Sequence, residues 1–269
     1  MESYLLLIIE KIILTFPRQL NSTFFNLISF FDKDNQVRTL NYGFAGKLKI
    51  TLSKDEESLR FGLQMYHHVA SKVSLNNKKI LEVGCGRGGG ASYIAKTFKV
   101  KSYLGVDFSS SAIKFCQKYY KNQKNLKFSF AEAHNLPRVR GGFDILINVE
   151  SSQTYHDEVG FFKEVFKILK KGGYFLLVTP RASEKVDPLI NDLKDVGFQV
   201  KNVEDITPNV IKALDIDSKR KASLIRQYAP SRFLKKSMEI FSAMPGTYHY
   251  NNFKKRDFVY LLKILQKPT

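Results

Sequence analysis

Short apolar segments alternate with amphipathic segments along most of the chain, and this pattern predicts the secondary structure. Short apolar runs bounded by turn residues are typical of buried strands, and apolar residues recurring every three or four positions are typical of helices. The predicted strands are residues 79–83, 103–106, 126–130, 143–149, 174–178, 198–203 and 258–265, and the predicted helices between them are residues 91–98, 110–120, 160–169 and 183–196. Such alternation predicts an α/β fold, a mostly parallel sheet with helices on both faces.

Two helical regions fall outside this alternation. Residues 1–52 predict an N-terminal helical extension, and residues 53–269 predict the main domain, which begins with a helix at 55–73. Residues 207–246 form a basic helical insert between the sixth and seventh predicted strands. We therefore expect one α/β domain with an extension and an insert.

The first 31 residues are strongly apolar and allow two interpretations. Their apolar side chains recur at helical spacing, but the uncharged run is far shorter than the roughly 18 residues of a spanning helix. No basic segment precedes the run, as it would in a signal peptide. Residues 1–31 are therefore predicted to be core or lid helices, or alternatively a helix lying on a membrane surface.

The composition is globular and strongly basic. Of the 269 residues 43% are hydrophobic and 25% are charged, which excludes wholesale disorder. The net charge of +18 favours anionic partners such as acidic lipid, nucleic acid or an acidic substrate. Cys85 and Cys116 cannot form a disulfide framework, so we expect a cytoplasmic location, with peripheral contact to an anionic membrane as the alternative. No Cys and His residues have zinc spacing, so no metal is expected.

A glycine-rich turn after the first strand is the most informative motif. The sequence from Ile80 to Gly90 is a buried strand followed by five glycines, and a helix is predicted to start immediately afterwards. Glycine lets the backbone approach a ligand, and a helix N-terminus offers free N–H groups. Asp107 ends the next strand, where its carboxylate can hold both hydroxyls of a ribose. The arrangement predicts a cofactor that contains a nucleoside.

Two cofactor classes fit this turn. Gly84, Gly86 and Gly89 satisfy the dinucleotide pattern G-x-G-x-x-G. Glu82 favours the other class, because an acid two residues before the first glycine would repel a pyrophosphate. S-adenosylmethionine has an amino group and a sulfonium instead of phosphates, and a carboxylate suits it. We therefore expect S-adenosylmethionine.

The string Glu-Val-Gly-Cys-Gly-Arg-Gly-Gly closely resembles the first motif of class I methyltransferases. Residues 131–137, 143–151 and 169–175 resemble, in order, the family's adenine-side loop, its fourth strand and the turn into its fifth. From about residue 65 onward the chain is similar to the phthiotriolone and fatty-acid O-methyltransferases and their polyketide relatives. The resemblance implies a Rossmann-like fold with a seven-stranded sheet, and methylation of a hydroxyl on a small, lipid-like or polyketide molecule.

The resemblance also implies cofactor contacts. Asp107 is expected to hold the ribose, Phe108 to pack on the adenine, and Asn148 to lie beside the sulfonium. Glu82 is expected at the methionine part, and Glu132 at the adenine edge, where many relatives have Asp. The full set of expected cofactor-binding residues is Glu82, Gly84, Cys85, Gly86, Gly88, Asp107, Phe108, Glu132, Ala133 and Asn148.

A general base is harder to assign. Methyl transfer is an in-line displacement that depends on alignment, and an alcohol acceptor also benefits from a group that takes its proton. Many relatives have a His shortly after the fourth strand, where this chain has Gln153 and Thr154. His156 follows and is our expected base, with an exposed helix-terminal residue as the alternative interpretation; His67 and His68 are further candidates. The expected substrate-pocket residues are Tyr66, Gln153 and Tyr155.

Other functions remain as alternatives. The insert corresponds to the family's lid over the acceptor pocket, or it is simply a solvated face or a surface for acidic lipid or nucleic acid. Methyl transfer to nitrogen or carbon of a small molecule is the alternative reaction. Nucleic acid is not the expected partner, because the fourth strand ends Asn-Val-Glu-Ser, without the prolines and aromatic residue of exocyclic-amine methylases. A binding protein without turnover is the remaining hypothesis.

Overall fold

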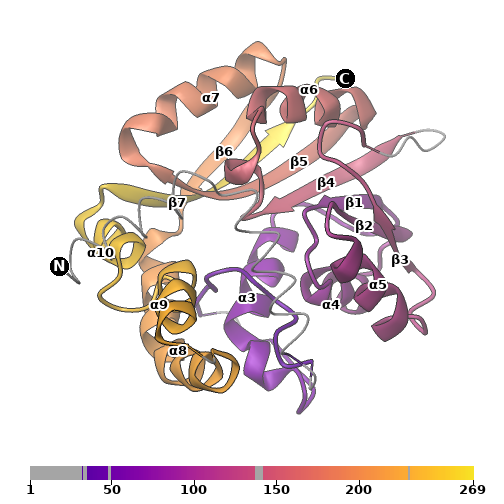
Figure 1. The fold of residues 1–269 in the computed structure, drawn as a ribbon. Helices are drawn as coiled ribbons and strands as arrows, with labels where there is room; N and C mark the ends of the chain where they lie inside the picture. Colours follow the sequence, from indigo (N-terminus) through magenta and orange to yellow (C-terminus); the bar gives the residue numbers. More distant parts are fainter. Residues whose placement is uncertain (1–31, 33–34, 48–49, 137–141, 230) are drawn as a thin grey trace.

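One twisted sheet divides the domain into two helical layers (Figure 1). The computed structural model describes all residues except 1–31, 33–34, 48–49, 137–141 and 230. The seven strands lie in the order β3-β2-β1-β4-β5-β7-β6. Their bounds are Lys79–Val83 for β1, Ser102–Asp107 for β2, Leu126–Phe130 for β3, Phe143–Val149 for β4, Leu169–Ala182 for β5, Gln199–Asp205 for β6 and Phe258–Gln266 for β7.

The sheet is mostly parallel, as expected. Strands β1 to β5 pair in parallel, and β7 runs antiparallel to both β5 and β6. The helices are α3 (Arg60–Ala70), α4 (Gly89–Thr97), α5 (Ser110–Tyr119), α6 (Glu158–Ile168), α7 (Val186–Asp195), α8 (Thr207–Tyr228), α9 (Arg232–Phe241) and α10 (Tyr248–Lys255), with 3-10 turns η1 (Glu57–Leu59), η2 (Ser152–Thr154) and η3 (Ser183–Lys185). Six of the seven strands match the predicted ones closely in position, whereas β5, predicted at 174–178, extends over Leu169–Ala182.

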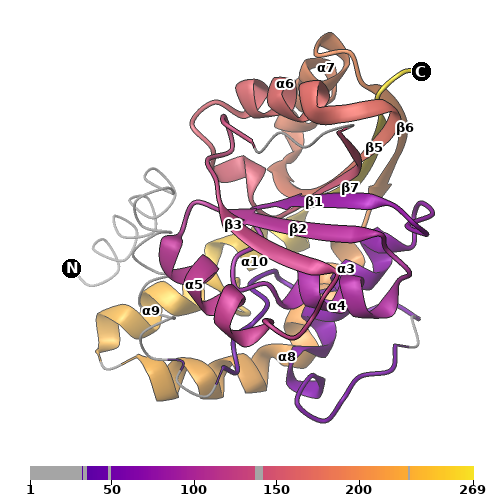
Figure 2. The same cartoon turned by 90° about the vertical axis from the view of Figure 1, so that its right-hand side faces the viewer.

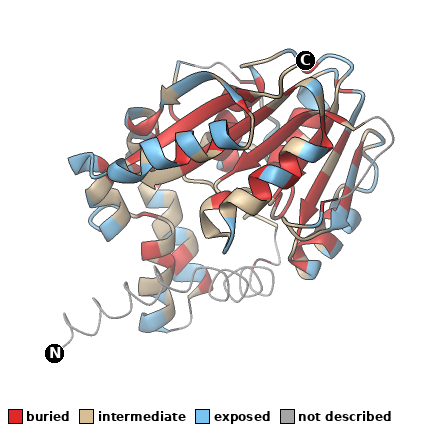
Figure 3. Cartoon of the chain, turned by 90° about the horizontal axis from the view of Figure 1, so that it is seen from above, coloured by how far each residue is buried: buried red, intermediate tan, exposed pale blue. Residues whose placement is uncertain are grey.

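Each face of the sheet has its own apolar core. Ile80 of β1 packs in the core beneath α3, α4 and α8, whereas Leu81 and Val83 pack in the core beneath α6 and α7. Alternate residues of a strand point to opposite faces, so a strand buried on both faces must be apolar throughout. Figure 3 shows the central strands as buried between exposed helix faces, and their apolar sequences could therefore be located well.

The predicted helix boundaries needed three corrections. The expected helix at 55–73 begins as the 3-10 turn η1 and is α-helical only over α3. The expected helix at 183–196 divides into η3 and α7. Helix α10 was not predicted, because residues 248–255 contain few apolar side chains and only Phe253 among them is buried.

The described part of the N-terminal extension is a strap, not a helix. Residues 35–47 run as an extended strap across the glycine-rich turn, where Gly89 donates its N–H to the carbonyl of Arg38 at 3.0 Å. Arg87 and Asp32 form an ion pair at 3.0 Å beneath it, and both side chains are almost completely buried. The two helices predicted within residues 1–31 lie outside the described residues.

Within the described residues, no helix has the length and apolar character needed to cross a bilayer.

Candidate functional site

A cavity of about 310 Å³ opens at the carboxyl ends of β1, β2 and β4. In open α/β sheets this edge, where the strand order reverses, is the place where ligands bind. The cavity is lined by the strap, Tyr66 of α3, the glycine-rich turn, the loops after β2, β3 and β4, Pro180 of β5, and the α9–α10 region. Segments far apart in the sequence therefore meet around one space.

The glycine-rich turn has a backbone that other residues would strain or block. Gly84, Gly86 and Gly88 have φ of 78°, 51° and 73°. A Cβ on Gly84 would lie 2.1 Å from the Ser151 hydroxyl oxygen. Among the described residues that line the cavity, Gly84 and Gly86 are present but Cys85 and Gly88 are not, and cofactor contact by those two stays a prediction. Gly88 is needed instead for packing, because a Cβ there would meet the ring of Phe128 at 2.7 Å.

Asp107 lies in the cavity wall at the end of β2, as expected. Its Oδ2 accepts the Gly86 N–H at 2.8 Å, and its Oδ1 accepts the Ser109 N–H at 2.9 Å. Burial raises the pKa of Asp107, although these backbone N–H groups lower it in part. Each carboxylate oxygen can accept a second hydrogen bond, so the side chain is oriented and retains acceptor capacity for a diol.

Glu82 is not among the described residues that line the cavity, and its expected contact with the methionine part of the cofactor stays a prediction. Tyr66 donates its hydroxyl to Oε1 of Glu82 at 2.7 Å, and Tyr103 donates its hydroxyl to Oε2 at 2.9 Å. Burial raises the pKa of Glu82 to about 7. The carboxyl lies behind the wall because Glu82 is inside β1, one residue before the strand ends. It acts on the cavity only by orienting Tyr66, which does line it.

Asn148 is likewise withdrawn from the cavity, against expectation. Its side-chain nitrogen donates to the Val83 carbonyl at 2.9 Å, and its Oδ1 accepts the Ser152 N–H at 3.0 Å. The side chain is fully buried. Asn148 therefore ties the end of β1 to η2 and holds the loop after β4 in place.

The adenine-side residues Phe108, Glu132 and Ala133 line the cavity, as expected. His156 lines it too, but it is exposed, with its ring 4.5 Å from that of His134 in the loop after β3. The expected base therefore lies at the rim beside the adenine-side loop, away from the apolar end formed by α9.

The two other histidine candidates, His67 and His68, lie outside the cavity wall. A ring nitrogen of His67 contacts the Tyr93 hydroxyl at 2.8 Å, and His68 stacks on Phe44 at 4.1 Å and contacts Glu204 at 3.0 Å. Neither histidine is among the described residues that line the cavity. On helix α3 they lie one and two positions beyond Tyr66, and a helix turns about 100° per residue, so they point elsewhere.

Tyr155 and Gln153 line the cavity, as predicted for the substrate pocket. The Tyr155 hydroxyl lies 2.7 Å from that of Ser151 and accepts a long bond of 3.4 Å from the side chain of Asn148. The Oε1 atom of Gln153 is buried, and no described residue donates a hydrogen bond to it. It is thus available to a ligand N–H or O–H.

Glu150 and His249 are two of the residues in the cavity wall that the sequence analysis did not single out. Glu150 follows β4 directly with φ of 52°, a conformation uncommon for a residue with a side chain. Its Oε1 accepts the Tyr42 N–H at 2.6 Å, and burial raises its pKa to about 7. His249 lies in α10; burial lowers its pKa to about 4, and its buried Nδ1 has no hydrogen-bond partner in the described chain.

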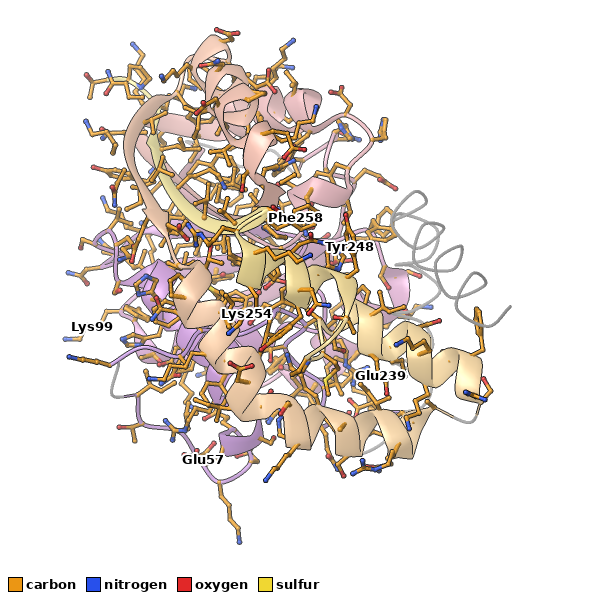
Figure 4. All side chains as sticks on the ribbon, turned by 90° about the vertical axis from the view of Figure 1, so that its left-hand side faces the viewer. Glu57, Lys99, Glu239, Tyr248, Lys254 and Phe258 are labelled. Carbon is orange, nitrogen blue, oxygen red and sulfur yellow. The ribbon has the colours of Figure 1, made fainter. Side chains whose placement is uncertain are left out.

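Of Glu150 and His249, only Glu150 could have been predicted from the sequence as a residue of the cavity wall. Glu150 could have been found as the first residue after a buried strand, at the edge where ligands bind. His249 could not, because it reaches the cavity through the packing of α10, where its neighbour Tyr248 lies against Phe258 at the start of β7 (Figure 4). Among the described residues, no three His, Cys, Asp or Glu side chains gather as a metal site requires.

Residues 74–212 match the family model described as a methyltransferase domain. The chain is 35% identical over 201 residues to the fatty-acid O-methyltransferase of Mycolicibacterium smegmatis, covering 74% of this chain and 73% of that protein. It is 32% identical over 200 residues to the phthiotriol/phenolphthiotriol dimycocerosates methyltransferase of Mycobacterium leprae, with the same coverage of 74% and 73%.

Two solved structures share the fold at lower sequence identity. The cyclopropane synthase MmaA2 of Mycobacterium tuberculosis matches with a TM-score of 0.71 at 14% identity, over 90% of this chain and 98% of that chain. The geranyl diphosphate C-methyltransferase of Streptomyces coelicolor A3(2), solved with S-adenosyl-L-homocysteine, matches with a TM-score of 0.64 at 15% identity, over 88% and 94%.

Proposed function

Because this chain belongs to the class I S-adenosylmethionine-dependent methyltransferases, we propose that it methylates an oxygen of a lipid-like acceptor. The observation that supports this most directly is that one cavity is lined both by cofactor-binding groups and by apolar side chains. That wall contains the glycine-rich turn and Asp107, and also the apolar side chains of Pro180, Ile240 and Phe241. Relatives with 32–35% identity are named for a fatty acid and for phthiotriol dimycocerosates.

The residues present fit the methyl donor. The absence of a Cβ at Gly84 leaves backbone open toward the cavity, and Asp107 retains acceptor capacity for the ribose hydroxyls. Phe108 offers a ring for the adenine, and Glu132 and Ala133 line the same end. S-adenosylmethionine supplies a methyl group on a positively charged sulfur.

Glu150 is the general base that this geometry favours. It lies in the cavity wall directly after β4, in contrast to the exposed His156 at the adenine-side rim. A base works best when its pKa is near the working pH, and burial raises the pKa of Glu150 to about 7. Glu150 would accept the proton of an acceptor hydroxyl as the oxygen forms its bond to the methyl carbon. The carbon–sulfur bond would break in the same step and leave S-adenosylhomocysteine.

The same residue favours a hydroxyl over a carboxylate as the acceptor. A carboxylate is already ionised at neutral pH and needs no base. Beside an ionised Glu150 it would also meet a like charge, which disfavours the charged form of either group. The proposed acceptor is therefore a lipid-like alcohol.

Replacement of Asp107 by Ala is expected to weaken S-adenosylmethionine binding by about 2–3 kcal/mol, because a hydrogen-bond acceptor with a charge is lost. Isothermal titration calorimetry measures this directly. Asp144→Ala is the matched control, since Asp144 pairs with Lys170 at 2.7 Å and is not among the described residues of the cavity wall. Equal affinity for the two variants would contradict the assignment of Asp107 to the ribose.

We also propose that the protein contacts anionic membrane through α9. This helix presents Arg232 and Lys235 to solvent together with Phe233, whose side chain is 62% exposed. Figure 2 shows α8 and α9 together on the side of the molecule opposite α6 and α7. Basic groups around an exposed ring suit an acidic lipid surface, where the ring enters the headgroup layer.

Flotation with phosphatidylserine-containing vesicles is expected to recover the protein at low salt and to lose much of it at high salt. Exposed charges are screened over about 10 Å at 0.1 M ionic strength. Phe233→Ser should reduce flotation, whereas Phe130→Ser, which alters an exposed ring at the end of β3, should not. Deletion of residues 1–31 tests the prediction that the N-terminal segment contributes. Equal flotation of both Phe variants would rule out α9 as the contact.

A further inference from the structure

A second cavity adjoins the first beneath the strap. It has a volume of about 90 Å³ and lies between residues 36–42, α8 and α9. Four residues line both cavities: Leu40, Asn41, Tyr42 and Phe241. The two spaces are therefore separated only by shared side chains of the strap and α9.

The wall of the second cavity is mainly hydrocarbon. Leu59, Leu224, Ile225 and Met238 contribute apolar surface, and none of the described residues in this wall is acidic. Burial of such surface against an apolar ligand is favourable, at about 0.8 kcal/mol per CH₂ group.

Several polar side chains in this wall already have partners within the protein. Tyr228 donates its hydroxyl to Asp32 at 3.1 Å, and Arg220 donates to both carboxylate oxygens of Asp217 at 2.6 and 2.5 Å. Asn41 donates to the Gly62 carbonyl at 3.3 Å. These groups therefore do not require a polar ligand.

Polar groups gather instead where the two cavities meet. Lys221 lines the second cavity and Glu150 the first, and the two interact electrostatically. The amine of Lys221 donates to the Tyr42 carbonyl at 3.4 Å, and the Tyr42 N–H is donated to Glu150. A ligand spanning both spaces would thus place a polar head near Glu150 and an apolar part beyond Tyr42.

We propose that the second cavity holds the hydrocarbon chain of the acceptor, so that the substrate class is a single-chain amphiphile with a hydroxyl head. This rests on the proposed oxygen methylation for the position of the head. The strap and Phe241 then select for chain length, because a short alcohol would fill only the first cavity. The position of the bound hydrocarbon chain can be measured by a binding experiment that does not require methyl transfer.

The test uses the absence of tryptophan from the chain. Phe241→Trp introduces one indole in the wall that both cavities share, as an exchange of one aromatic ring for another. The probe is octadecanol with bromine at mid-chain, which quenches indole fluorescence on close approach. Saturable quenching is expected. Its absence in a variant that still binds S-adenosylmethionine would overturn the proposal.

A second substitution tests which cavity holds the hydrocarbon chain of the ligand. Leu224→Phe, added to the reporter, should fill the second cavity and weaken binding of the brominated octadecanol at least about tenfold, since excluding two CH₂ groups suffices. Ile216→Phe is the control, because Ile216 lies on the same helix with 54% of its side chain exposed. Brominated butanol should bind equally to both. Equal octadecanol affinity in the two variants, or equal weakening for butanol, would overturn the proposal.

Failure of the proposed reaction would look different. If the hydrocarbon chain binds as described but methyl transfer is not the function, the brominated octadecanol should still quench the indole fluorescence, and Leu224→Phe should still weaken its binding. No methylated octadecanol would form.

Discussion

Replacement of Glu150 by Gln is expected to lower kcat by about 10²- to 10⁴-fold, the usual contribution of a general base. The amide has nearly the same shape but cannot take the proton of the acceptor. In the wild-type enzyme kcat should rise about tenfold per pH unit below pH 7, because the base works only when it is deprotonated and its pKa is raised to about 7. Glu150→Gln should abolish this dependence. Initial rates at saturating S-adenosylmethionine and acceptor measure both effects.

Glu82→Gln is the control for the pH dependence. Burial also raises the pKa of Glu82 to about 7, but this residue does not line the cavity. The acidic limb of the profile should therefore persist in Glu82→Gln, whatever its rate. Loss of the limb in that variant, with retention in Glu150→Gln, would assign the titration to Glu82 and contradict the proposed base.

Histidine variants test the competing assignments. His156→Ala should lower kcat only slightly, because that side chain is exposed at the adenine-side rim. His249 lines the acceptor end, but its pKa of about 4 makes it a weak base near neutral pH. A loss of 10²-fold or more in His156→Ala, with a small effect in Glu150→Gln, would restore the original prediction from the sequence.

Asp32→Ala is expected to lower the free energy of unfolding by about 3–5 kcal/mol. This is the largest effect on stability that we predict. Asp32 accepts hydrogen bonds from Arg87, Tyr228 and the backbone N–H groups of Gln36 and Val37. Its removal leaves the guanidinium of Arg87 buried without this counterion, and it releases the start of the strap. Urea denaturation followed by circular dichroism measures the change.

Glu57→Ala is the matched control for this measurement. Glu57 also pairs with an arginine, Arg60, at 2.6 Å, but the two side chains are 47% and 33% exposed. Exposed ion pairs contribute at most about 1 kcal/mol. The double variant Asp32→Ala/Arg87→Met should regain part of the lost stability, since it also removes the unpaired charge. Similar losses for Asp32→Ala and Glu57→Ala would contradict a role for buried charge.

The sequence predicted the sheet and the cofactor turn well, because both leave a signal in residues that are close together in the sequence. Strands buried on both faces must be apolar, and the turn between β1 and α4 needs glycine at Gly84 because of its φ of 78° and the nearby Ser151. Asp107 was found because it is the last residue of β2. Both signals depend on neighbouring residues only.

Position along a strand decides which of the expected side chains reach the cavity. Glu82 and Asn148 each come one residue before their strand ends, and both side chains are used within the protein. Glu150, one residue beyond β4, reaches the cavity instead. The contributions of His249 and the strap depend on how distant segments pack, which no local pattern contains.

Transfer of a labelled methyl group can be followed from the donor to the acceptor. The protein is incubated with S-adenosylmethionine bearing a deuterated methyl group and an equimolar mixture of octadecanol and octadecylamine, and the products are analysed by mass spectrometry. We expect deuterated methyl octadecyl ether with an equal amount of S-adenosylhomocysteine. Label on the amine alone, or no labelled product from an enzyme that binds S-adenosylmethionine, would contradict methylation of a lipid-like alcohol.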